Sequence, residues 1–151
     1  MQPVPYRKDC KFCGIARREV DAHVVYSDED SVAFLDSRPL FPGHCLLIPV
    51  GHYETITDLP KNKVGPLLVD TRLVAAAVQN GMMADGSFVA INNKVSQSIP
   101  HLHIHIVPRK EKDGLRGFFW PRQKYTNAQE ISNVQNAIER AIAELLAKPD
   151  Y

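Results

Sequence analysis

The chain has 151 residues, of which 44% are hydrophobic and 23% are charged, and its formal net charge is +1. This length and composition suit one globular domain with one core, and the near-zero charge gives no reason to expect nucleic acid as an obligate partner. No apolar run approaches the ~18 residues that a membrane span requires, which excludes a membrane-spanning protein.

The first residues predict an arm and then a short helical turn. Residues 1–9 contain two prolines, which oppose regular structure, and they lack the apolar segment of a secretory signal. We therefore expect a loose arm at the start of a cytoplasmic protein. A helical turn is expected over 13–18.

Alternating patterns and apolar runs predict five strands, over 24–26, 32–35, 45–49, 87–92 and 101–107. The first two flank the turn 27–30 and are expected to form a hairpin. The third is wholly apolar and is expected to be buried on both faces. Pro108 is expected to end the last strand.

A long helix is predicted over 63–80, between the third and fourth strands. Thr57 or Asp58 can cap its start, and Gly81 can end it. Pro66 indicates a kink or a later start, because proline removes a helical hydrogen bond.

A second long helix is predicted over 127–146, with Asn127 as its N-cap and Glu130 completing a capping box. A hairpin beside strands that lack helical crossovers points to an antiparallel sheet. We therefore expect an α+β fold, a single domain with an antiparallel sheet of about five strands and two main helices. Its parts would be an arm over 1–9, the domain over 10–125, and over 126–151 a C-terminal helix that packs on the same domain.

Three of the six histidines alternate with apolar residues in the last predicted strand, at His101, His103 and His105. Alternate residues of a strand point to one face, so these imidazoles would share a face at intervals of about 7 Å. Such an array suits metal ligands, or a nucleophile whose neighbours orient it and handle protons. The strand alone does not decide between the two.

The surrounding sequence resembles the histidine triad family, whose motif is His-φ-His-φ-His-φ-φ with φ apolar. Residues 97–109 carry this motif, with Gln-Ser before it and Pro-Arg after it. A Cys-x-Phe-Cys turn at 10–13, Phe-Leu-Asp at 34–36 and the stretch 42–52 resemble the family in the same order. The resemblance covers about 10–109, and it implies a nucleotide hydrolase or transferase of the zinc-bearing bacterial type.

The resemblance assigns the catalytic roles to the triad. His103 would attack the α-phosphate of a nucleotide and form a nucleotidyl-histidine, which water or another acceptor then discharges. His105 would hydrogen-bond near the nucleophile or the phosphate, and His101 and Ser98 complete the catalytic set. A phosphoramidate has a labile P–N bond, so it divides one difficult displacement into two easier ones. The chain has no Gly-rich phosphate loop, which argues against kinase chemistry.

The resemblance also gives a set of nucleotide-binding residues. Gln97 and Ser98 would donate hydrogen bonds to the phosphate or the leaving group. Asn92, or Asn93 in its place, would touch the phosphate. Asp36 would accept hydrogen bonds from both ribose hydroxyls, and its alternative role is an Asx turn at the loop entry.

Cys10 and Cys13 have the spacing of half a zinc site, although a lone Cys-x-x-Cys is a weak signal. The resemblance to zinc-bearing triad proteins gives His52 and His101 as the other ligands. Zinc there would pin the N-terminal turn to the active strand and leave His103 free to react. The alternative is a reduced, metal-free pair.

Two further features have competing interpretations. Residues 109–122 carry five cations around Phe118, Phe119 and Trp120, and they suit either a solvated basic loop or a flap over the substrate. His44 follows a Pro-Gly pair and is expected to be a loop or strand-edge residue.

The leading hypothesis is therefore a hydrolase or transferase that acts on a dinucleoside polyphosphate or a nucleoside phosphoramidate. One alternative is a zinc-dependent hydrolase with all three triad histidines as ligands, and another is a nucleotide-binding sensor with little turnover. The resemblance also implies a homodimer. The helix over 63–80 is apolar on more than one side, which leaves a second face for a partner unless the C-terminal helix covers it.

Overall fold

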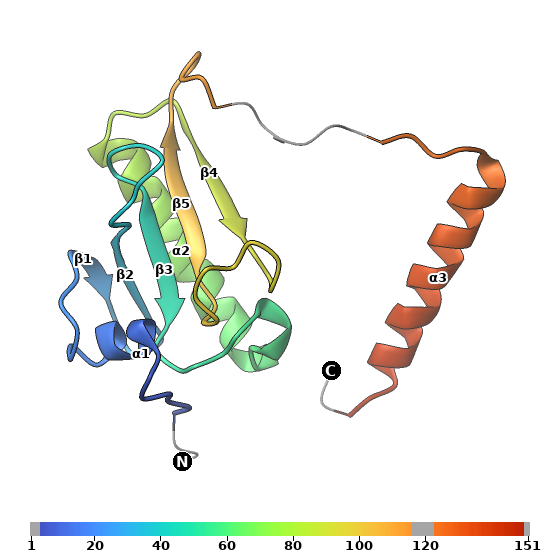
Figure 1. The fold of residues 1–151 in the computed structure, drawn as a ribbon, viewed down its shortest axis with the longest axis horizontal. Coiled ribbons are helices and arrows are strands. Elements are labelled where there is room, and N and C mark those ends of the chain that lie inside the picture. Colours follow the sequence, from blue (N-terminus) through green and yellow to red (C-terminus); the bar gives the residue numbers. More distant parts are fainter. Residues whose placement is uncertain (1–3, 116–122, 150–151) are drawn as a thin grey trace. The chain divides into compact units, whose positions relative to one another are not determined.

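The protein forms two compact units, over 1–113 and 114–151, in a computed structural model that describes residues 4–115 and 123–149 (Figure 1). The first unit contains helices and a sheet, and the second contains the helix α3 (Ala128–Leu146). None of the helices in the described ranges is both long and apolar enough to cross a membrane.

The first unit is a five-stranded antiparallel sheet with helices beside it. Its strands lie side by side in the order β1-β2-β3-β5-β4, and β1 and β2 form the predicted hairpin. The α+β class, the antiparallel sheet and the two long helices are confirmed. The elements are α1 (Lys11–Ala16), β1 (Val24–Ser27), β2 (Ser31–Leu35), β3 (Cys45–Pro49), the 3-10 turn η1 (Ile56–Asp58), α2 (Lys61–Gly81), β4 (Gly86–Ile91) and β5 (Ile104–Arg109).

Strand β5 begins and ends later than the sequence predicted. The backbone N–H groups of His101 and Leu102 bond to loop carbonyls, so residues 101–103 lead up to the strand without joining it. At the other end, Pro108 continues the strand and pairs with Ser87 of β4. Successive residues of a strand direct their backbone polar groups to opposite sides. The Arg109 carbonyl accepts from the Asp85 N–H on the side of β4, so the nitrogen of Pro108 faces the opposite side, where β3 pairs only as far as Ile106. The missing N–H therefore breaks no ladder bond.

Helix α2 begins at Lys61, two residues before the predicted range, and the residues predicted to cap it serve another element. Asp58 closes a capping box with Thr55 around the turn η1, and α2 begins only after Pro60. The helix runs through Pro66, whose missing N–H would have bonded to a carbonyl of an exposed residue in the first turn. It ends at Gly81, as predicted.

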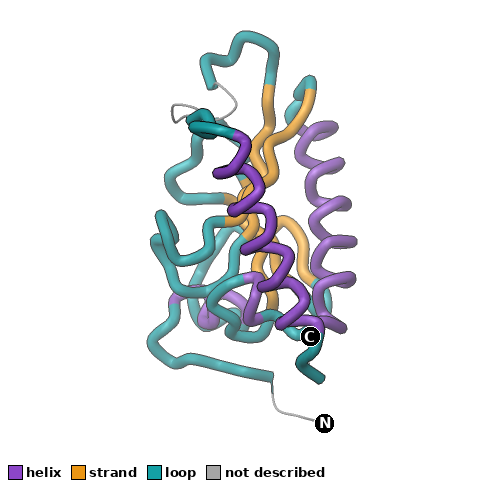
Figure 2. The backbone as a smooth tube through the Cα atoms, turned by 90° about the vertical axis from the view of Figure 1, so that its right-hand side faces the viewer, coloured by secondary structure: helices purple, strands orange, loops and turns teal. Residues whose placement is uncertain are grey.

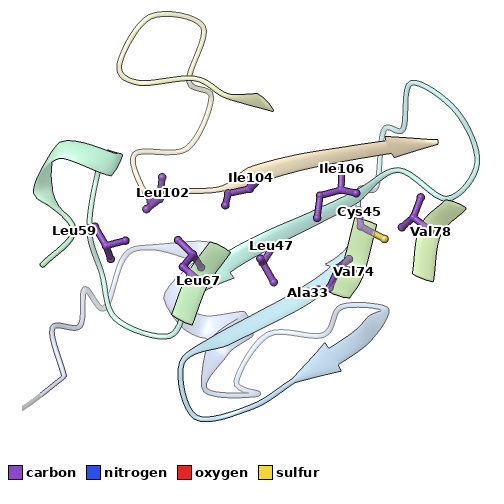
Figure 3. Packing of buried hydrophobic residues seen from close by; sticks show 10 residues of the cluster. All are labelled: Ala33, Cys45, Leu47, Leu59, Leu67, Val74, Val78, Leu102, Ile104 and Ile106. Carbon is purple, nitrogen blue, oxygen red and sulfur yellow. The ribbon is translucent and has the colours of Figure 1, made fainter. Parts of the chain in front are cut away.

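Both faces of β3 are buried, as predicted, and each face meets a different helix. In Figure 2 the strands form one layer with α2 along one side of it. Figure 3 shows the side chains that pack between the two layers. The strands and their flanks contribute Ala33, Cys45, Leu47, Leu102, Ile104 and Ile106, and α2 contributes Leu67, Val74 and Val78. The other face packs against Phe12 and Ile15 of α1. Because α1 has only six residues, it leaves part of this face uncovered.

The second unit confirms Asn127 as the N-cap of the C-terminal helix, but the reciprocal bond of the predicted capping box goes to the preceding residue. The Asn127 side chain accepts a hydrogen bond from the Glu130 N–H at 2.9 Å. The Glu130 carboxylate bonds to the N–H of Thr126, one residue before the cap. The apolar stripe that includes Ile131 and Ile138 is exposed within this unit. The packing of this helix on the sheet domain, and the boundaries 10–125 and 126–151, stay predictions.

Candidate active site

A cleft of about 1110 Å³ opens on the face of the sheet that α1 leaves uncovered. Three adjacent strands supply its floor, with Phe34 from β2, Leu46 from β3 and His105 from β5. His103 joins them from the segment just before β5. The histidines therefore lie on the face opposite α2, while Ile104 alternates with them and packs against that helix.

The hydrogen bonding of His103 defines its tautomer. Its ring is almost fully buried, and its Nδ1 lies 2.7 Å from the carbonyl oxygen of His101. A carbonyl only accepts hydrogen bonds, so Nδ1 carries a proton, and in the neutral ring the lone pair is therefore on Nε2. The ring of Phe12 meets the imidazole edge-to-face, with centroids 5.3 Å apart, and restrains its rotation. This is the state that a nucleophilic imidazole requires.

A chain of hydrogen bonds defines the tautomer of His105 as well. The Leu40 N–H donates to Nδ1 of His44 at 3.1 Å, so the proton of His44 is on Nε2. That Nε2 lies 3.0 Å from Nδ1 of His105, which must accept. The remaining nitrogen of His105, Nε2, therefore carries a proton. It is a neutral hydrogen-bond donor at the cleft, beside the ring of His103 at a centroid distance of 5.0 Å.

The pKa values of His105 and His44 agree with the neutral tautomers. Burial, followed by the neighbouring His103 and His44, lowers the pKa of His105 to about 4, against a smaller opposing effect of Asp36. Burial also lowers the pKa of His44, and Asp36 opposes that shift. Both rings are neutral at neutral pH, so the direction of the hydrogen bonds is preserved.

His44 is the site residue that the sequence interpretation missed. It is a loop residue at the edge of β3, as the sequence predicts, but it is also buried and bonded to His105. A signal was present in the sequence, because His44 immediately precedes the apolar strand β3. Alternation places it on the same face as Leu46, which is the cleft face.

Four of the predicted site residues line one cleft: Asp36, Ser98, His103 and His105. Asp36 follows β2, and one of its carboxylate oxygens lies 3.7 Å from Nε2 of His44. Its other oxygen accepts from the N–H of Arg38 at 2.9 Å, which is the Asx turn that was the alternative role. The two roles are compatible, because a carboxylate has lone pairs for several donors.

Gln97 and the asparagines are placed differently. The Gln97 side chain donates to the Glu54 carbonyl at 2.6 Å and accepts from the Lys94 N–H at 2.8 Å, so it fastens its own loop. Asn93 likewise accepts from a backbone N–H of η1 at 3.0 Å. Asn92 follows the last residue of β4. None of these three is among the residues that line the cleft.

Cys10, Cys13, His52 and His101 form a cluster whose ligand atoms all lie within 4.8 Å of one another. Sγ of Cys13 is 3.3 Å from Nδ1 of His52, and both sulfurs are 3.5–3.6 Å from Nδ1 of His101. In a tetrahedral zinc site, Zn–S and Zn–N bonds of the usual lengths separate sulfur from nitrogen by roughly 3.6 Å. The spacing of these four residues therefore fits zinc.

The orientation of His101 also fits a metal ligand. Its Nε2 lies 3.0 Å from the Pro49 carbonyl, which holds the proton on Nε2 and points the Nδ1 lone pair at the sulfurs. Burial lowers the pKa of His101 to about 4, so the ring is neutral. With its carbonyl bonded to His103, this residue connects the cysteine cluster to the nucleophile.

The basic segment after the triad is described only in its first half. Arg109 binds Asp113 with two hydrogen bonds, at 2.6 and 3.0 Å, which close a turn after β5. Phe118, Phe119, Trp120 and the two arginines that flank them lie in 116–122, outside the described residues. The flap and the solvated loop therefore both stay predictions.

Known proteins match most of the chain. The model of the HIT domain matches residues 17–112. An adenylylsulfatase of Arabidopsis thaliana is 37% identical over 111 residues, which are 72% of this chain and 56% of that protein. A bis(5'-nucleosyl)-tetraphosphatase of Schizosaccharomyces pombe is 33% identical over 96 residues, which are 62% of this chain and 53% of that protein. The chain thus spans little more than half the length of these two relatives.

Solved structures share the fold over nearly their whole length. A protein of Streptococcus mutans gives a TM-score of 0.83 at 28% identity, and the match covers 94% of this chain and 90% of that one. A zinc-bound histidine triad family protein of Mycobacterium smegmatis gives 0.68 at 31% identity, covering 90% and 97%.

Proposed function

Since the chain belongs to the HIT domain family, we propose that it is a nucleotide hydrolase or nucleotidyl transferase that acts at the α-phosphate of a nucleotide conjugate. The reaction passes through a covalent nucleotidyl-histidine at His103. The observation that carries this proposal is the tautomer of His103, whose Nε2 keeps its lone pair at the cleft. The relative named as a bis(5'-nucleosyl)-tetraphosphatase supports a dinucleoside polyphosphate as a substrate, and the one named as an adenylylsulfatase supports a nucleotide conjugate in general. A nucleoside phosphoramidate is the other substrate that we propose.

The chemistry divides between two displacements at phosphorus. Nε2 of His103 attacks the α-phosphorus, a P–N bond forms, and the bond to the leaving group breaks with its electron pair. Water or another acceptor then attacks the same phosphorus, which releases the nucleotide and restores the imidazole. His105 donates from Nε2 to a phosphoryl oxygen, and the Ser98 hydroxyl adds a second donor as charge develops. His101 acts through its carbonyl, which holds the nucleophile's tautomer.

The remaining nucleotide contacts are proposed by position. Asp36 accepts from the ribose hydroxyls with the lone pairs that the Asx turn leaves free. Asn92, next to the end of β4, contacts the phosphate. Gln97 would have to break its hydrogen bond to the Glu54 carbonyl before it could contact the phosphate. We therefore propose that its main role is to hold the loop that carries Ser98.

We propose that Cys10, Cys13, His52 and His101 bind a structural zinc ion. The ion would supply a cross-link between α1 and the segment that leads into β5, without contact to the substrate. The alternative with all three triad histidines as ligands has less support. Nδ1 of His101 points at the cysteines, and Nδ1 of His103 and of His105 is already hydrogen-bonded.

Trapping the covalent intermediate tests the proposed function. The wild-type protein is incubated with adenosine and guanosine 5'-phosphoramidates and with dinucleoside polyphosphates, and it is quenched at alkaline pH, where P–N bonds last longest. Mass spectrometry is expected to find one added nucleotidyl group, on the peptide that contains His103. Nucleotide binding without any adduct or turnover would favour the sensor, and an adduct on another residue would contradict the mechanism.

We also propose a homodimer that forms through α2. Leu68, Val69 and Leu73 are 49–66% exposed on this helix, although they are apolar. Light scattering at micromolar concentration is expected to give about twice the chain mass of 17.0 kDa. Val69→Glu is expected to give the single-chain mass with an unchanged circular dichroism spectrum, and Asn62→Glu, at an exposed polar position of the same helix, is the control. A wild-type mass of one chain would exclude the dimer.

A further inference from the structure

The cleft crosses the sheet from the triad to the segment that precedes β1. His105 of β5 pairs with Leu46 of β3, and Leu46 pairs with Phe34 of β2, and all three line the cleft. Beyond β2 the cleft is lined by residues 21–23, whose backbone is hydrogen-bonded to the end of that strand. Three strand spacings therefore separate the two ends of the cleft, a distance of about 14 Å.

This order along the cleft fixes the direction of a bound nucleotide. The phosphate must lie at the His103 and His105 end, where the reaction takes place. Asp36, at the end of β2, lies between that end and residues 21–23, which is the place of the ribose. The base is then carried toward β1, over a floor that includes Phe34 and Ile15. An apolar floor suits the faces of a base, but it does not distinguish one base from another.

Polar side chains at this end include Asp21 and His23, and of these two Asp21 is the one that can accept two hydrogen bonds from a base. Its side chain is exposed, it lines the cleft, and it has no hydrogen bond or ion pair to any residue of the described ranges. An ionised carboxylate has only acceptors. Guanine presents two adjacent donors, N1–H and the 2-amino group, which match both carboxylate oxygens. Adenine presents its 6-amino donor beside the acceptor N1, which a carboxylate repels.

We propose that Asp21 is a specificity-determining residue that selects guanine at the base end of the cleft. The inference rests on the proposed function for the direction of the nucleotide. It assigns to the protein a guanosine conjugate as its substrate class. A paired contact of this kind discriminates between bases by about 10- to 100-fold.

The test compares matched substrates and matched variants. The kcat/KM values are measured for guanosine, inosine and adenosine 5'-phosphoramidates, which differ only in the base. The wild type is expected to favour guanosine over adenosine by about 10- to 100-fold. Inosine, which keeps N1–H and lacks the 2-amino group, is expected to fall between them. Asp21→Asn keeps the size of the side chain but removes the charge and one acceptor, and it is expected to abolish the preference.

The control and the contrary outcomes separate this inference from the proposed function. Glu111→Gln removes an exposed carboxylate outside the cleft and is expected to leave the preference unchanged. Equal rates for all bases, a preference for adenosine, or a guanosine preference that survives in Asp21→Asn would overturn the inference while the function stands. If no conjugate is cleaved, the function fails. Calorimetry with GMP and AMP then decides the inference, which requires tighter GMP binding that Asp21→Asn removes.

Discussion

Replacing His103 with alanine is expected to lower kcat by at least about 10⁴-fold, because the variant has no group to form the covalent bond. Binding of the product nucleotide is expected to persist, since His105, Ser98 and Asp36 remain in the cleft. The measurements are steady-state turnover of a phosphoramidate and calorimetry with the nucleotide. A variant with near wild-type turnover would contradict the mechanism.

Two further variants make this experiment specific. His103→Gly opens a space at the nucleophile, and added imidazole is expected to restore part of the turnover because it supplies the missing nitrogen. Glu111→Gln changes an exposed side chain outside the cleft and is expected to keep the activity. A loss in Glu111→Gln as large as that in His103→Ala would show that the assay does not report the nucleophile.

Loss of zinc is expected to cost the protein about 10 °C of melting temperature. The protein is expected to purify with about one zinc per chain. A cross-link between α1 and the segment before β5 contributes several kcal/mol, and each kcal/mol corresponds to roughly 2–4 °C for a chain of this size. Elemental analysis and thermal unfolding of the wild type and of Cys13→Ser, with and without added zinc, measure both quantities.

Two outcomes would remove or relocate this metal site. No bound zinc after metal-free purification and reconstitution would eliminate it. Zinc retained by a Cys10→Ser/Cys13→Ser double variant would point to the triad histidines instead. Cys45→Ala is the matched control, because this buried thiol lies outside the cluster. Its zinc content is expected to equal that of the wild type.

The sequence predicted the elements whose signals are local. The two apolar runs that flank the turn 27–30, the apolar run at β3 and the Asn127 cap each depend on neighbouring residues, and the structure contains all three. The start of β5 was wrong because the N–H of Leu102 bonds to the Tyr53 carbonyl, 49 positions away in the chain. The alternation of the histidine segment cannot predict a hydrogen-bond partner so far away in the chain.

The same difference between local and long-range signals explains which residues of the candidate site the sequence could predict. The spacing of the triad predicted three histidines on one face, because the pattern lies within five residues, and the resemblance gave His103 as the proposed nucleophile. The role of His44 depends on a partner 61 residues away, and the fastening of Gln97 on a carbonyl 43 residues away. The zinc cluster also joins residues that are 39 to 91 positions apart, and only the resemblance to a family brought them together.

The hydrogen bonds that run from the Leu40 N–H through His44 to His105 all point the same way. Their dipoles therefore add, and the positive end of the sum emerges at Nε2 of His105, as it does at the first turn of a helix. The site attracts an anion with aligned neutral groups instead of a cation. Because both imidazoles are neutral at neutral pH, this attraction does not depend on their protonation there. It favours an oxygen that lies in line with the hydrogen bonds over one that is merely close.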